Sequence, residues 1–190
     1  MDANPVSTLM DLNVKLDTET KNNKKEAEAE EDLKINHSYT QLIRSLMYLA
    51  LASRPDISYA VNQLVQFTSN PKAMHWTAVK QIFRYLKQTK NDKLTYRGSD
   101  DEIKNTKLNF FCDADWANNS DQKSINGYVT IIAGGAVAWS LKKQQTVALS
   151  TAKAKYIAAT HVAKQVLWHH SLYMELNFLL PKTSTIFTDN

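Results

Sequence analysis

The sequence predicts a mixed α/β (α+β) protein in which a helical region precedes a β-sheet. Two observations lead to this prediction. Apolar residues recur at helical spacing over residues 39–89, and after residue 107 three short extended runs, one long helix and a last extended run follow. Strands joined by tight turns pair antiparallel, whereas a strand reached through a long helix pairs in parallel. We therefore expect a β-β-β-α-β unit with a mixed sheet in the second half.

The helical region is expected to contain three helices with short connections. The first begins at Tyr39, where the apolar spacing sets in, and stops near Arg54. Pro55 suits the first turn of a second helix, and Asn70 with Pro71 starts a third.

The elements of the second half follow from runs of β-branched and aromatic residues. Gly134 and Gly135 are expected to form a tight hairpin turn. The expected strands are residues 93–97, 108–112, 127–133, 136–141 and 184–188, and the expected long helix is 147–176.

Composition places the chain among globular proteins and excludes several classes. The 190 residues are 43% apolar and 22% charged, enough for one domain or one domain with an appendage. A single cysteine, Cys112, excludes an internal disulfide framework and a cysteine-built zinc site. No apolar run approaches the ~20 residues of a membrane-spanning helix, and the N-terminus lacks the apolar segment of a signal peptide. We expect an intracellular protein of the cytoplasm or nucleus, with no membrane association.

The charge is distributed unevenly. Residues 1–36 carry nine acidic and five basic groups, whereas residues 37–190 carry 10 acidic and 18 basic groups. A basic body attracts polyanions, so nucleic acid is a candidate partner, although moderately basic domains often bind none. The polar segment 17–34 cannot bury enough apolar surface to fold alone, so it is either disordered or a solvated helix. The expected organisation is an acidic, largely disordered leader (1–37), a helical region (38–92) and a sheet domain (93–190).

Two aspartates mark a candidate site. Asp113 and Asp189 each follow an expected strand, and neighbouring strand ends would place their carboxylates side by side. Mg²⁺ prefers oxygen ligands, and two such ions ~3.5–4 Å apart can promote phosphodiester cleavage. The alternative is that each aspartate only belongs to a turn. Lys142, Lys143 and Gln144, after the third strand, could bind phosphates or form a solvated turn.

Several motifs together resemble one family. The segment CDADWANNSDQKSINGYVTIIAGGAVAWSLKKQQTVALSTAKAKYIAA resembles the ribonuclease H domain of copia-type retrotransposon polyproteins. The upstream stretches SLMYLALASRPDISYAVNQLVQF and NPKAMHWTAVKQIFRYLKQTK resemble the helical connection between reverse transcriptase and ribonuclease H, and DANPVSTLMDLNVKL resembles the end of the polymerase portion. The resemblance implies a ribonuclease H-like mixed sheet and Mg²⁺-dependent cleavage of RNA in RNA–DNA hybrids.

Only part of the catalytic set of that family is found at the matching positions of this chain. By resemblance, Asp113 is the first acid and Asp189 the third, but Lys155 stands where the family has a catalytic glutamate. The fourth aspartate would lie beyond Asn190, as would the last elements of the fold. An ammonium replaces a metal ligand, and Coulomb terms of about 1–4 kcal/mol per charge pair oppose cation binding. We therefore expect a truncated, catalytically inactive pseudoenzyme with no Mg²⁺ bound.

The expected partners follow from charge and from the incomplete sheet. Nucleic acid, such as an RNA–DNA hybrid, should bind weakly and in a salt-sensitive way. Self-association is expected through the outer edge of the last strand. The alternative function is a non-enzymatic, effector-like protein, retained by a host for nucleic-acid or protein contacts.

Overall fold

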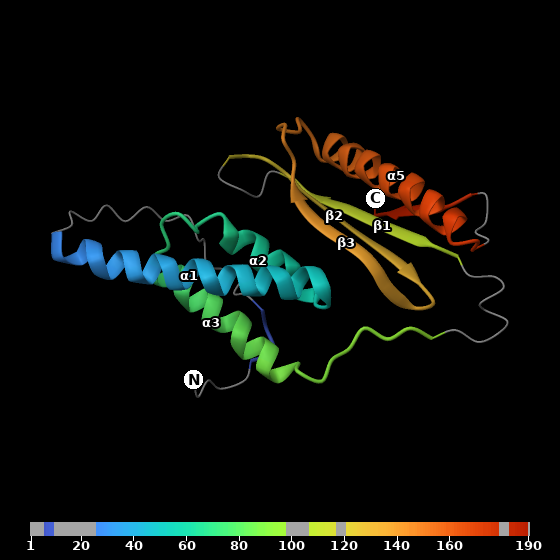
Figure 1. Cartoon of the computed structure of the whole chain (residues 1–190). Coiled ribbons are helices and arrows are strands. Elements are labelled where there is room, and N and C mark those ends of the chain that lie inside the picture. Colours follow the sequence, from blue (N-terminus) through green and yellow to red (C-terminus); the bar gives the residue numbers. More distant parts are fainter. Residues whose placement is uncertain (1–5, 10–25, 98–106, 117–120, 179–182, 190) are drawn as a thin grey trace. The chain divides into compact units, whose positions relative to one another are not determined.

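The chain folds into two compact units. The structure, a computed structural model, describes residues 6–9, 26–97, 107–116, 121–178 and 183–189. One unit runs from Met1 to Lys93 and the other from Leu94 to Asn190. The first unit is helical and the second contains the sheet (Figure 1). The predicted α+β fold class is confirmed.

The three predicted helices are present in the first unit. They are α1 (Glu26–Ala52), α2 (Ser58–Val65), which follows the 3₁₀ turn η1 (Pro55–Ile57), and α3 (Ala73–Gln88). Pro55 opens η1 because its fixed φ suits a first helical turn. The first helix begins earlier than the apolar pattern, so the acidic residues 26–37 are helical. Residues 17–25 of the charged segment lie outside the described part of the chain.

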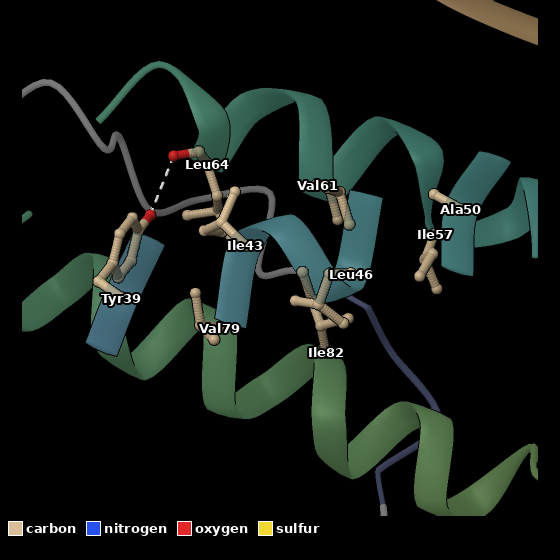
Figure 2. Close-up of a cluster of buried hydrophobic side chains, with 10 residues drawn as sticks. Tyr39, Ile43, Leu46, Ala50, Ile57, Val61, Leu64, Val79 and Ile82 are labelled. Atoms are coloured by element: carbon tan, nitrogen blue, oxygen red, sulfur yellow. Dashed lines mark hydrogen bonds between the residues drawn. The ribbon is translucent and has the colours of Figure 1, made fainter. Parts of the chain in front are cut away.

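One face of α1 builds the core of the helical unit. Tyr39, Ile43, Leu46 and Ala50 are spaced by four, three and four residues, which aligns them on one side of the helix. Figure 2 shows these side chains meeting residues of the two following helices. The buried cluster consists of Tyr39, Ile43, Leu46, Ala50, Ile57, Ala60, Val61, Leu64, Val79 and Ile82.

The second unit contains a four-stranded mixed sheet. Its strands are β1 (Asn109–Asp115), β2 (Ile125–Ile132), β3 (Gly135–Lys143) and β4 (Thr185–Thr188). The spatial order is β3-β2-β1-β4. The β1–β2 and β2–β3 pairs are antiparallel, and β4 pairs in parallel with β1. This is the predicted β-β-β-α-β topology, which the ribonuclease H resemblance implies.

The long helix α5 (Thr151–Glu175) packs on the sheet and connects β3 to β4 (Figure 1). Ser150 caps its start, because the Ser150 side chain accepts a 3.2 Å hydrogen bond from the Lys153 backbone N–H. Val162 packs against Phe110 and Cys112 of β1 in a buried cluster. This packing orients the second turn of α5, and Lys155 with it, toward the end of β1.

Two local predictions were wrong. Residues 93–97 form no strand: Arg97 N–H donates one bond to the Ala133 carbonyl, and Tyr96 instead bonds through its hydroxyl to the Ala136 carbonyl. One backbone hydrogen bond does not make a ladder. The hairpin turn is also shifted by one residue, because Ala133 and Gly134 carry the positive φ angles, 49° and 73°, and Gly135 begins β3.

The expected strand ends also moved. β1 continues past the expected Cys112 to Asp115, so Asp113 lies inside the strand, paired with Gly127 of β2. The helix α5 begins at Thr151 rather than at residue 147, because the Ser150 cap fixes its start.

In the described part of the chain, no helix has both the length and the apolar character needed to span a bilayer.

Candidate active site

Asp113 and Asp189 lie next to one another at one edge of the sheet. The parallel register pairs Phe111 with Phe187 and Cys112 with Thr188, so Asp113 and Asp189 are the next residues along the two neighbouring strands. Both residues are exposed. Their side chains are close enough for Asp113 to affect the pKa of Asp189. The expected juxtaposition of the two carboxylates is therefore present.

The third group at this edge is a lysine. Lys155 Nζ of α5 lies 2.8 Å from Asp189 Oδ1 and donates a second hydrogen bond, of 3.0 Å, to the Asp189 carbonyl oxygen. The Lys155 side chain is 24% exposed and that of Asp189 is 67% exposed. The hydrogen bond and positive charge of Lys155 lower the pKa of Asp189, against an opposing effect of desolvation. Asp189 is therefore held as a carboxylate facing an ammonium.

These residues do not fit a divalent cation. Mg²⁺ needs several oxygen ligands, and within the described ranges only two carboxylates converge here, while an ammonium is bonded to one of them. Among the residues that the structure describes, no three His, Cys, Asp or Glu side chains are grouped so that they could hold a metal ion. The metal chemistry implied by the resemblance therefore has no ligand set at this edge.

Cys112 adds no ligand, although it lies on β1 directly before Asp113 and pairs with Thr188 of β4. Its side chain is buried. Burial and the negative charge of Asp113 raise the pKa of the thiol. A protonated, buried thiol behaves as a small apolar residue.

The predicted phosphate-binding residues separate into two groups. Lys142 is exposed, and Lys143 is half-buried and pairs with Asp121 at 2.9 Å. Gln144 is only 5% exposed, and its amide donates hydrogen bonds to Asn126 and to the Ala154 carbonyl. Gln144 therefore connects β2, the end of β3 and the first turns of α5, and its amide is not presented to solvent.

Sequence reasoning did not single out a basic stripe on α3. Lys80, Arg84 and Lys87 are spaced by four and three residues, so they share one face of that helix. Lys80 and Lys87 are exposed, and Arg84 is half-buried. Residues 37–93 hold eight basic and two acidic groups, whereas residues 94–190 hold ten basic and eight acidic groups. Six of the eight net positive charges of residues 37–190 therefore lie in residues 37–93, as the positions of the charges in the sequence already show, although the helical unit as a whole also contains the acidic residues 1–36.

Comparison with known proteins identifies the family. The chain is 41% identical over 153 residues to the retrovirus-related Pol polyprotein from transposon TNT 1-94 of Nicotiana tabacum, which covers 80% of this chain and 11% of that protein. It is 37% identical over 153 residues to the retrovirus-related Pol polyprotein from transposon RE1 of Arabidopsis thaliana, with 80% of this chain and 10% of that protein covered. The chain belongs to the Pol polyprotein family of copia-type retrotransposons. It spans about a tenth of the length of these Pol polyproteins.

A further relative of this Pol-family chain is shorter. Secreted RxLR effector protein 161 of Plasmopara viticola is 37% identical over 134 residues, which covers 70% of this chain and 92% of the effector. No family model matches the chain, and no solved structure does. The Pol family is thus assigned by sequence relatives, and the β-β-β-α-β sheet agrees with it.

Proposed function

We propose that this Pol-derived chain binds nucleic acid through its basic surfaces and does not cleave the RNA strand of RNA–DNA hybrids. The observation that carries the second part is the Lys155–Asp189 ion pair. By the family resemblance, Lys155 replaces the catalytic glutamate, and its ammonium is bonded to the aspartate that would be a metal ligand. With only two carboxylates converging at this edge, one of them bonded to an ammonium, the described residues do not provide the ligands that a water-activating metal needs.

The α3 stripe supports the binding part of the proposal. Three basic groups on one helix face provide a line of phosphate contacts, of which Lys80 and Lys87 are exposed. Lys142, exposed at the end of β3, and Lys143 are secondary contacts. Gln144 is left out of this surface because its amide is bonded inside the protein. Such contacts position a backbone and do not read bases, so little sequence preference is expected.

Fluorescence anisotropy with a labelled RNA–DNA hybrid tests the binding. Affinity should fall steeply between roughly 50 and 200 mM salt, because phosphate contacts release counterions. The Lys80→Glu/Lys87→Glu double variant should weaken binding about 10-fold or more at the lower salt and reduce the salt slope by about two.

A charge-matched control tests whether binding depends on the basic stripe of α3 or only on the net charge of the protein. The Lys153→Glu/Lys164→Glu double variant changes two exposed lysines of α5 by the same total charge. It should weaken binding much less than the α3 variant. Equal losses would assign binding to net charge alone and remove the role of α3, and no binding at low salt would contradict the proposed function.

A protein-binding, effector-like role is the second candidate. Its support is the similarity to Secreted RxLR effector protein 161, most of whose length this chain covers. The anisotropy experiment also discriminates the two, because a protein-binding role needs no salt-dependent affinity for nucleic acid.

A further inference from the structure

The edge strand β4 is short and makes few contacts within the sheet. It contains four residues, of which Thr185, Phe187 and Thr188 are exposed. Among the described strands, only β1 pairs with it, over four residues in parallel register. A pairing this short provides few hydrogen bonds, and short edge strands of this kind fray readily. Additional contacts must therefore hold β4 on the sheet.

Those contacts come from α5, at both ends of the strand. At one end Lys155 Nζ bonds the side chain and the main-chain carbonyl of Asp189. At the other end His170 Nε2 lies 2.7 Å from Ser184 Oγ. Between them Ile186 packs into the cluster that contains Val162. The helix thus runs antiparallel along β4 and fastens it at three points.

The two-bond contact of Lys155 is the most specific of the three. A surface ion pair between two side chains can rearrange easily, but a lysine that also bonds a backbone carbonyl fixes the path of the chain at Asp189. Lys155 is also the more buried partner of the pair. The positive charge of the same ammonium stabilises the carboxylate form of Asp189 and lowers its pKa.

We propose that Lys155 acts as the resident cation of this site: its ammonium replaces a divalent metal as the charge that joins Asp189 to α5, and it holds β4 on the sheet without any metal. The residue that makes this site unsuitable for Mg²⁺ is therefore also the residue that holds β4 in place. The end of β4 should be ordered in metal-free solution and indifferent to divalent cations.

Hydrogen exchange of the full chain, without nucleic acid, tests this proposal separately from the proposed function. In Lys155→Met the amides of Thr185–Thr188 should exchange about 3- to 10-fold faster, and those in the centre of β2 should be unchanged. Lys155→Arg keeps the charge and should retain most of the protection. Lys153→Met, on the same turn of α5 with an exposed side chain, should behave as the unmodified chain.

Paramagnetic Mn²⁺ tests the exclusion of metal. In the unmodified chain, Mn²⁺ should cause no selective line broadening at Asp113 or Asp189, and excess Mg²⁺ should leave the exchange of β4 unchanged. If the amides of β4 exchanged as slowly in Lys155→Met as in the unmodified chain, the proposal that Lys155 holds β4 on the sheet would be overturned. Selective Mn²⁺ broadening at the two aspartates of the unmodified chain would overturn the role of Lys155 as resident cation.

Discussion

The Tyr39 hydroxyl donates a 2.9 Å hydrogen bond to the Leu64 carbonyl in the core of the helical unit (Figure 2). Leu64 lies in the last turn of α2, and its carbonyl also accepts a 3.2 Å backbone hydrogen bond from the Phe67 N–H. The tyrosine is therefore a second donor to this carbonyl, and it joins α1 to the end of α2. Burial raises the pKa of Tyr39 to about 12.

Replacing this tyrosine should destabilise the protein. Tyr39→Phe keeps the ring but removes one buried hydrogen bond to the Leu64 carbonyl, which should lower the free energy of unfolding by about 1 kcal/mol. Urea unfolding of the full chain, followed by circular dichroism, measures the change. Tyr48→Phe is the control, because Tyr48 is exposed on the same helix and its loss should have almost no effect. Equal effects of the two variants would contradict the role of the hydrogen bond.

Alkaline pH should act through the same residue. Because the folded pKa of Tyr39 is raised, its contribution to stability is complete below the unfolded pKa of ~10 and is lost as the pH rises toward 12. Tyr39→Phe should therefore lose less stability over this range than the unmodified chain. Some loss should remain, because burial also raises the pKa values of Tyr128 and Tyr173. Parallel stability curves for the two proteins would contradict this assignment.

A second prediction concerns the polar cluster around Asp56. Arg54 donates three hydrogen bonds of 2.7, 2.9 and 3.2 Å to the Asp56 carboxylate and also bonds Thr89 after α3. Tyr85 donates a further bond of 3.0 Å to Asp56. Burial alone would raise the pKa of Asp56, but the bonds from Arg54 and Tyr85 outweigh it and lower the pKa.

Asp56→Asn should lower the free energy of unfolding at neutral pH by about 1 kcal/mol, because the pair is partly exposed. A lowered pKa means that the contribution is present above roughly pH 4 and is lost as the pH falls through the folded value. The difference between variant and unmodified chain should therefore shrink in acid, as thermal unfolding at several pH values would show. Asp92→Asn, a control at an exposed position, should leave the free energy of unfolding almost unchanged. If the stability difference between Asp56→Asn and the unmodified chain stayed constant into strong acid, the Arg54–Asp56 ion pair would not be its cause.

A third prediction concerns the start of β3. A Cβ added at Gly135 would lie 2.5 Å from Tyr96 Cδ1 and 2.7 Å from the Thr95 carbonyl oxygen. Gly135→Ala should destabilise the protein by about 1–3 kcal/mol, because a backbone oxygen cannot move aside cheaply. Gly127→Ala is the matched control, since its Cβ would meet nothing closer than 3.9 Å. Thermal unfolding should separate the two variants, and equal melting temperatures would refute the close approach.

Local sequence patterns predicted much of this fold, and the topology followed from them. The helical spacing of Ile43 and Leu46 predicted the face of α1 that is buried, and the long helix before the last strand predicted that β4 is parallel. That crossover is also why Asp113 and Asp189 could be expected side by side although they lie 76 positions apart in the printed sequence.

The predictions that failed concern residues whose surroundings are set by contacts with distant parts of the chain. Gln144 was expected at a phosphate-binding surface, but its burial depends on Asn126 of β2 and Ala154 of α5, which no local pattern reveals. Residues 93–97 have strand-like composition, yet Arg97 finds a single backbone partner at the hairpin turn. The pairing of Lys155 with an aspartate was expected, but its second bond, to the Asp189 carbonyl, depends on how α5 lies along β4.

The most direct test of the account is hybrid cleavage by the purified chain. A labelled RNA–DNA hybrid is incubated with the protein in Mg²⁺ or Mn²⁺, alongside Asp113→Asn and Asp189→Asn variants, and RNA products are separated by size. Because Lys155 is bonded to Asp189, we expect no RNA cleavage above that of the two variants. Metal-dependent cleavage by the unmodified chain that disappears in Asp113→Asn would contradict the account.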